Sequence, residues 1–147
     1  MPASVADTQV EWAIATLLQH HDALRLRFNT TDAQDKPCWQ QYNADASNPP
    51  NPVSIDLSDL SFVQQQQAIA SHGSQLHAST ALSNANLFQA AHFTRGTRQP
   101  SWLLISLHHL AVDGISWQIL KDDLRTLLSP NLQQNTKPKL SPKTTAF

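Results

Sequence analysis

The sequence predicts a domain of mixed α/β structure, of the α+β kind, in which helices pack on one mixed sheet. Three segments place apolar residues three or four positions apart, as amphipathic helices do, while shorter segments alternate or are almost wholly apolar, as strands are. The predicted order is helix, hairpin, helix, strand, strand, helix. With 147 residues the chain is long enough for one ordinary domain with a buried core.

The first part of the chain predicts a helix followed by a hairpin. The helix reaches about Asp22, because side chains recur along one face at Val10, Ile14, Leu17, Leu18, His21 and Leu24. Residues 24–28 (LRLRF) and 38–42 (CWQQY) alternate across the turn-rich stretch NTTDAQDKP, so we expect two paired strands. Residues 43–51 should form a loop, and residues 52–57 a short extended segment.

A second helix is expected to begin near Ser61, because Ser61 and Gln64 have the spacing of a capping box. Gly73 would be the weak point of this helix. Its apolar face is expected to carry Phe62, Ile69 and Leu76.

Two further strands and a third helix complete the pattern. Residues 87–94 (LFQAAHFT) read as a strand, the turn GTRQP follows, and residues 102–107 (WLLISL) are nearly all apolar, which is typical of a strand covered on both faces. The third helix would carry Asp122 and Asp123 away from its apolar residues. Those apolar residues are Trp117, Leu120, Leu124 and Leu127.

Polar and proline-bearing sequence follows Ser129, which divides the chain into two parts. We expect a partial lobe over residues 1–129 and a polar linker or truncated continuation over residues 130–147.

Composition excludes several classes of protein. A net charge of −1 and a pI near 6.6 leave no basic surface for nucleic acid or for an anionic membrane. The single Cys38 cannot form an internal disulfide and fits a reducing compartment. No signal peptide stands at the start and no run reaches the roughly 18 apolar residues of a membrane span, so we expect a cytoplasmic protein.

The stretch LLISLHHLAVDGISWQIL, residues 103–120, holds the candidate site. A buried strand that runs into a polar turn fixes the backbone while exposing side chains, and the imidazole of histidine suits proton transfer near neutrality. Strand alternation sends His108 and His109 to opposite sides. Asp113 follows His109 by four residues, and Gly114 permits a tight turn before the helix.

Two simpler roles for these residues stay open at this point. A histidine at a strand end is commonly structural, and an aspartate before a helix is commonly a cap. Zinc would need more ligands than His109 and Asp113, and no second ligand pair stands out, so no metal site is predicted.

The string HHLAVDG matches the HHxxxDG signature of the condensation-domain superfamily of nonribosomal peptide synthetases. Three blocks resemble the epimerization subtype of that superfamily. GISWQIL (residues 114–120) is similar to GVSWRIL, where condensing domains have a Trp in the place of Ile115. HHDALRLRF (residues 20–28) and LSPKTTAF (residues 140–147) resemble further epimerization-domain blocks.

The resemblance implies a two-lobed fold, each lobe like chloramphenicol acetyltransferase, with the active site between the lobes. This chain matches only the N-terminal lobe, without the PIQ-type block expected ahead of Val10 and without the second lobe and its glutamate. We therefore expect a fragment: a truncated gene product, a pseudogene-like remnant or the result of an incomplete gene model.

The implied reaction is inversion of the L- to the D-configuration at Cα of an aminoacyl or peptidyl thioester. No cofactor would bind directly, because the substrate arrives on the phosphopantetheine arm of a carrier protein. The expected partners are that carrier protein, the missing second lobe and the other synthetase modules.

The resemblance also assigns roles to the site residues. His109 would transfer the proton and His108 would support it. Asp113 would be structural, paired with Arg25 or Arg27, and Gly114 would shape the turn.

Three further residues have expected positions. Trp117 is expected in the core. His20 and His21 are expected to end the first helix, where a cation is favourable against the helix dipole.

Three alternative functions remain. In a peptide-bond-forming condensation domain, the same histidine would orient or deprotonate an attacking amine. An isolated lobe would dock a carrier protein without turning anything over. A small CoA-dependent acyltransferase would build its site between the protomers of a trimer.

Overall fold

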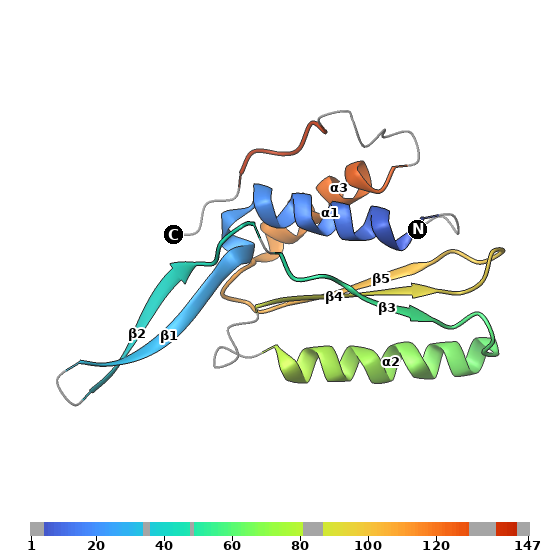
Figure 1. Cartoon of the computed structure of the whole chain (residues 1–147), viewed down its shortest axis with the longest axis horizontal. Coiled ribbons are helices and arrows are strands. Elements are labelled where there is room, and N and C mark those ends of the chain that lie inside the picture. Colours follow the sequence, from blue (N-terminus) through green and yellow to red (C-terminus); the bar gives the residue numbers. More distant parts are fainter. Residues whose placement is uncertain (1–4, 34–35, 48, 81–86, 130–137, 144–147) are drawn as a thin grey trace.

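Helices cover both faces of a small mixed sheet, and a hairpin projects from one end (Figure 1). The coordinates are a computed structural model and describe residues 5–33, 36–47, 49–80, 87–129 and 138–143. The sheet has the order β3-β4-β5, with β3 parallel to β4 and β4 antiparallel to β5. These strands span Val53–Asp56, Phe88–Thr94 and Trp102–Leu107. The predicted α/β fold with a mixed sheet is confirmed.

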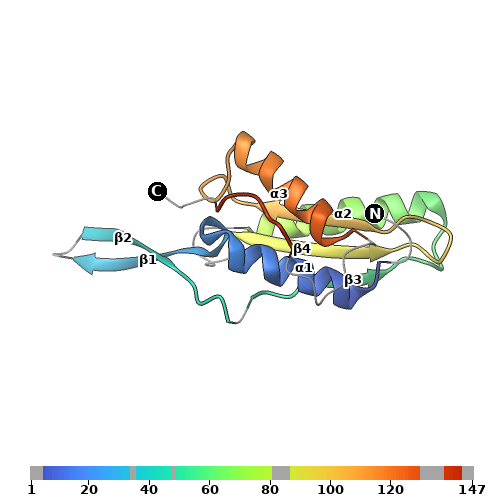
Figure 2. The same cartoon turned by 90° about the horizontal axis from the view of Figure 1, so that it is seen from above.

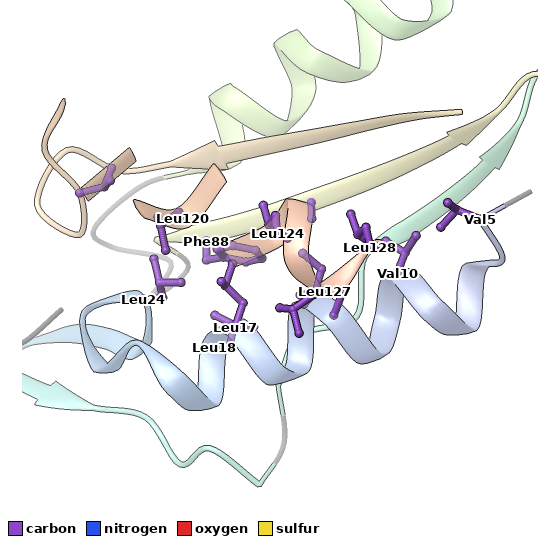
Figure 3. Packing of buried hydrophobic residues seen from close by; sticks show 14 residues of the cluster. Val5, Val10, Leu17, Leu18, Leu24, Phe88, Leu120, Leu124, Leu127 and Leu128 are labelled. Carbon is purple, nitrogen blue, oxygen red and sulfur yellow. The ribbon is translucent and has the colours of Figure 1, made fainter. Parts of the chain in front are cut away.

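Helices α1 (Asp7–His20) and α3 (Gly114–Leu127) pack together on one face of the sheet (Figure 3). Both helices present leucines at helical spacing, and these side chains meet Phe88 and Ala90 of β4. The largest cluster of the core lies here. Its buried members include Val10, Ile14, Leu17, Leu18, Leu120, Leu124 and Leu127.

Helix α2 (Phe62–Ser79) covers the opposite face (Figures 1 and 2). It begins with the predicted capping box, in which the Ser61 hydroxyl accepts from the Gln64 N–H and the Gln64 side chain accepts from the Ser61 N–H. Ile69 and Leu76 pack toward Phe93, as predicted. Phe62 does not: its side chain is 56% exposed and lies near the guanidinium of Arg95.

The hairpin is formed by β1 (Leu26–Ala33) and β2 (Lys36–Asn43), paired antiparallel as predicted (Figure 2). Two details differ from the prediction. The strands extend into the stretch expected to be a turn, and Leu24 and Arg25 belong to a 3₁₀ turn, η1 (Asp22–Arg25). Arg25 stabilises that turn, because its Nε donates to the Leu18 carbonyl and its Nη2 to the Asp22 carboxylate.

Strand β5 is less covered than its apolar sequence predicts. Its side chains are half-buried, except that Trp102 is 39% exposed. Leu104 faces α2, and Leu103 and Ile105 face the α1–α3 side, so both faces have neighbours. Among the described strands β5 pairs only with β4, so one of its edges has no strand beside it.

Residues 138–143 lie against α1 and α3, where Leu140 packs on the main cluster. The final residues of the LSPKTTAF block, 144–147, lie outside the described residues. The boundary expected after residue 129 stays a prediction. None of the described helices is long and apolar enough to cross a bilayer.

Candidate active-site loop after β5

The loop that joins β5 to α3 is held by its backbone and by two buried side chains. The His108 N–H donates to the Leu87 carbonyl at 2.9 Å, and the Ala111 N–H donates to the His108 carbonyl at 2.9 Å. Ala111 packs against the base of the hairpin, and Val112 enters the main core cluster. The loop is therefore anchored while the side chains between its anchors remain outside.

His109 is the exposed histidine of the pair. Its ring makes no hydrogen bond within the part of the chain that the structure describes. His108 is half-buried, and its Nδ1 accepts from the Leu110 N–H at 3.2 Å, which places the proton of a neutral ring on Nε2. The two rings thus differ in burial and in hydrogen bonding, while the roles assigned to His108 and His109 stay predictions.

Asp113 is the N-cap of α3, where its Oδ1 accepts from the Ser116 N–H at 2.7 Å. This backbone hydrogen bond lowers the pKa of the exposed Asp113 carboxyl. Gly114 opens the helix and has no described atom within 4 Å of where a Cβ would stand, so no neighbour there requires a glycine.

The predicted pairing of Asp113 with Arg25 or Arg27 is wrong. Asp113 is exposed and binds its own helix, whereas Arg25 binds Asp22. The half-buried Arg27 donates to the Leu26 carbonyl, and burial lowers its pKa. The aspartate with a buried partner lies elsewhere.

That aspartate is Asp123, and the prediction that it lies away from the apolar residues of the third helix is wrong. It is 2% exposed, and its Oδ2 lies 2.7 Å from Nε2 of the fully buried His21. Its Oδ1 accepts from the Ser141 N–H at 2.8 Å. A sequence signal existed, because Asp123 follows Leu120 by three residues and therefore lies on the apolar face of α3.

Burial disfavours the charged form of both partners, and so it shifts the pKa values of His21 and Asp123 in opposite directions. Burial lowers the pKa of His21 below its usual 6.5, although the Asp123 hydrogen bond works against this. Burial also opposes ionisation of Asp123, but hydrogen bonds from Ser141 and His21 outweigh it and lower the pKa of that carboxyl. The prediction that His20 and His21 end α1 is confirmed in position, but His21 favours its neutral form there.

A cavity of about 870 Å³ lies along β5 and α3. Its lining includes Trp102, Leu103, Ile105, Trp117 and Leu128, while His109 is not among the lining residues. Trp117 also packs against the main core cluster, so its predicted place in the core is confirmed in part. The cavity and the exposed histidine are therefore separate features of the described structure.

A family model for the condensation domain matches residues 1–147, the whole chain. This chain belongs to the condensation-domain family. As a condensation-domain segment it is 41% identical over 138 residues to a linear gramicidin synthase of Brevibacillus parabrevis, covering 92% of this chain and 2% of that protein. It is 36% identical to chondramide synthase of Chondromyces crocatus, covering 99% of this chain and 4% of that protein.

Solved epimerization and condensation domains have the same fold as this condensation-domain segment. The epimerization domain from the third module of tyrocidine synthetase B matches with a TM-score of 0.75 and 28% identity, covering 97% of this chain and 31% of that chain. A condensation domain that releases the product of the enacyloxin polyketide synthase matches with a TM-score of 0.68 and 21% identity, over 88% of this chain and 24% of that one. The segment thus spans about a third or less of each solved chain.

Proposed function

We propose that this condensation-domain segment is the N-terminal lobe of an epimerization domain of a nonribosomal peptide synthetase. The observation that carries the proposal is His109, whose ring is exposed on an anchored loop and has no hydrogen-bond partner among the described residues. The domain inverts Cα of an aminoacyl or peptidyl thioester.

The thioester makes the reaction feasible, because it acidifies the Cα proton of the bound amino acid. His109 would remove or return this proton on one face, and an acid or base from the second lobe would act on the other face. A positioned general acid or base contributes about 10²–10⁴-fold to such a step. The protonated imidazole would also donate to the enolate oxygen.

Two observations support epimerization over condensation. The solved epimerization domain of tyrocidine synthetase B resembles this chain with a TM-score of 0.75. Ile115 follows Gly114, and its side chain is 76% exposed beside the loop, where a condensing domain would have a Trp.

The proposal implies partners that lie outside this chain. The substrate would arrive on the phosphopantetheine arm of a carrier protein, and the second lobe would close the opposite wall of the site. Neither a cofactor nor a metal takes part in the proton transfer.

The test uses a hybrid domain in which this chain replaces the matching segment of the tyrocidine synthetase B epimerization domain. The hybrid is incubated with an L-aminoacyl carrier protein, and the released amino acid is resolved by chiral chromatography. We expect the D-isomer to accumulate.

Two outcomes would overturn the proposal. A folded hybrid that leaves the amino acid in the L-form, while the parent tyrocidine domain inverts it, excludes epimerization. Formation of a peptide bond with a second aminoacyl carrier protein, without inversion, assigns condensation instead.

A further inference from the structure

We infer that His20, His21 and Asp123 form a site for a transition-metal ion of the Zn²⁺ class, separate from the reaction proposed for His109. One ligand atom from each of these side chains lies within 4.8 Å of the other two. They come from the end of α1 and from the buried face of α3, which the core holds together.

The spacing of the donor atoms approaches that of a tetrahedral site. Nε2 of His21 lies 2.7 Å from Oδ2 of Asp123. Zinc–nitrogen and zinc–oxygen bonds of about 2.0–2.1 Å put neighbouring ligand atoms about 3.3 Å apart, so these two atoms need to separate by about half an ångström. The His20 and His21 rings are edge to face at 4.7 Å between centroids, so the two imidazoles are in direct contact.

A backbone carbonyl beside His20 is the candidate for a fourth donor. The Ser141 carbonyl oxygen lies 2.7 Å from Nε2 of His20. The N–H of Ser141 donates to the Asp123 carboxylate. A metal would take the position that ring protons now occupy. Each neutral imidazole would carry its proton on Nδ1 and offer the Nε2 lone pair, so two nitrogens and two oxygens surround the ion.

Charge favours a cation at this position. Asp123 is 2% exposed, and no lysine or arginine within the described ranges forms an ion pair with it. A buried carboxylate is costly unless it is paired or coordinates a metal. His20 is only half-buried, so the site is reachable from solvent through that ring.

Binding of Zn²⁺ to the tag-free chain tests the inference. The protein is stripped with EDTA and desalted, Zn²⁺ is titrated in competition with a chromogenic indicator, and bound metal is counted by mass spectrometry. We expect one equivalent per chain. Co²⁺ in place of Zn²⁺ should give the visible absorption bands of a tetrahedral site.

His20→Ala is the deciding variant, because His20 is half-buried whereas His21 and Asp123 lie in the core. Loss of a ligand should weaken the zinc affinity by more than the about 10- to 100-fold that loss of a ligand's supporting hydrogen bond costs. Zinc should raise the melting temperature of the parent chain and not that of the variant. His77→Ala, an exposed histidine on α2, is the matched control and should bind as the parent does.

Each contrary result overturns the inference. Absence of stoichiometric zinc from the parent chain would leave a hydrogen-bonded network only. Equal affinity in His20→Ala and in the parent would place the bound metal on other residues. Neither result bears on the epimerization proposal, which needs no metal.

Discussion

His21 and Asp123 form a buried polar contact between the end of α1 and α3. They are 102 positions apart in the sequence, both are buried, and they bind each other within an otherwise apolar cluster. Removing one partner of a buried pair leaves the other without compensation.

Substitution of His21 by alanine is therefore expected to be strongly destabilising. His21→Ala should reduce the free energy of unfolding by about 3–5 kcal/mol, as measured by urea denaturation. The exposed His77→Ala should change it by less than about 0.5 kcal/mol. A loss below about 1 kcal/mol in His21→Ala would contradict the account of a stabilising buried pair.

The same pair predicts a pH dependence of stability. Burial lowers the pKa of His21 below 6.5, so the unfolded chain binds this proton more readily than the folded chain does. The stabilisation is complete above pH 6.5 and is lost as the pH falls through the folded pKa. Asp123, whose pKa is lowered from 3.8, extends the loss into more acidic solution.

Urea midpoints at pH 7.5 and pH 5.5, measured in EDTA, test this dependence. We expect a lower midpoint at pH 5.5 for the parent chain and a smaller difference for His21→Gln, which cannot take up the proton. Equal midpoints in the parent chain at both values would contradict the buried neutral histidine.

At the residue scale the sequence was informative where the signal was local. Strand alternation predicts that His108 and His109 differ. In the structure both residues follow the end of β5, where His108 is half-buried and His109 is exposed. The proposed partner of Asp113 was wrong, because a short-range cap to Ser116 satisfies its carboxylate. The buried acid is Asp123, whose spacing from Leu120 indicates its place on the apolar face of α3 but not its partner. Pairing across 102 positions is a property of the fold, not of the local pattern.

At the scale of elements, Gly73 tests how closely helix α2 packs on strand β5. Gly73 lies inside the helix, where glycine is intrinsically less favourable than alanine. A Cβ at this position would be 3.4 Å from Cδ2 of Leu104, the flexible end of a side chain on β5.

Gly73→Ala is expected to raise the free energy of unfolding by about 0.5–1 kcal/mol. Chemical denaturation of the variant beside the parent chain measures the difference. A destabilised variant would mean that α2 packs more tightly on β5 than the distance to Leu104 indicates.

Periodicity predicted every α-helix of the described structure and both strands of the hairpin. It did not predict the start of the first hairpin strand or the packing of the first turn of α2. Leu24 and Arg25 alternate like a strand, yet Arg25 has hydrogen-bond partners that hold a 3₁₀ turn. Phe62 has the right helical spacing, but it lies in the first turn of α2, beyond the part of the helix that packs on the sheet, where Arg95 offers a cation–π contact. Such ends are decided by contacts that spacing does not encode.

At the scale of the whole molecule, one edge of β5 has no neighbour among the described strands, and a cavity of about 870 Å³ beside β5 is lined by apolar side chains such as Leu103, Ile105 and Trp117. Monomeric proteins rarely expose large contiguous apolar patches. The chain by itself is therefore expected to enhance the fluorescence of the dye ANS and to associate as its concentration rises.

Dye fluorescence and light scattering measure these two effects, with the hybrid domain as the control. The hybrid supplies the rest of an epimerization fold, so its dye signal per molecule should be lower. A chain that stays monomeric at all concentrations and does not enhance the dye would show that its apolar surface is covered in solution.

The sequence also predicted the family, which the family model over the whole chain and the similarity to linear gramicidin synthase confirm. It did not decide between inverting and joining amino acids, because one lobe supplies only one side of the proposed site. The exposed ring of His109 is compatible with the proton transfer that we propose on one face of a substrate.

Exchange of the Cα proton with solvent tests the central claim most directly. The hybrid domain is incubated with an L-aminoacyl carrier protein in D₂O, and deuterium at Cα is followed by mass spectrometry, with His77→Ala as the control. We predict exchange in the parent hybrid, unchanged exchange in the control, and a fall of about 10²–10⁴-fold in His109→Ala. A folded His109→Ala hybrid that exchanges at the parent rate would contradict the assignment of proton transfer to His109.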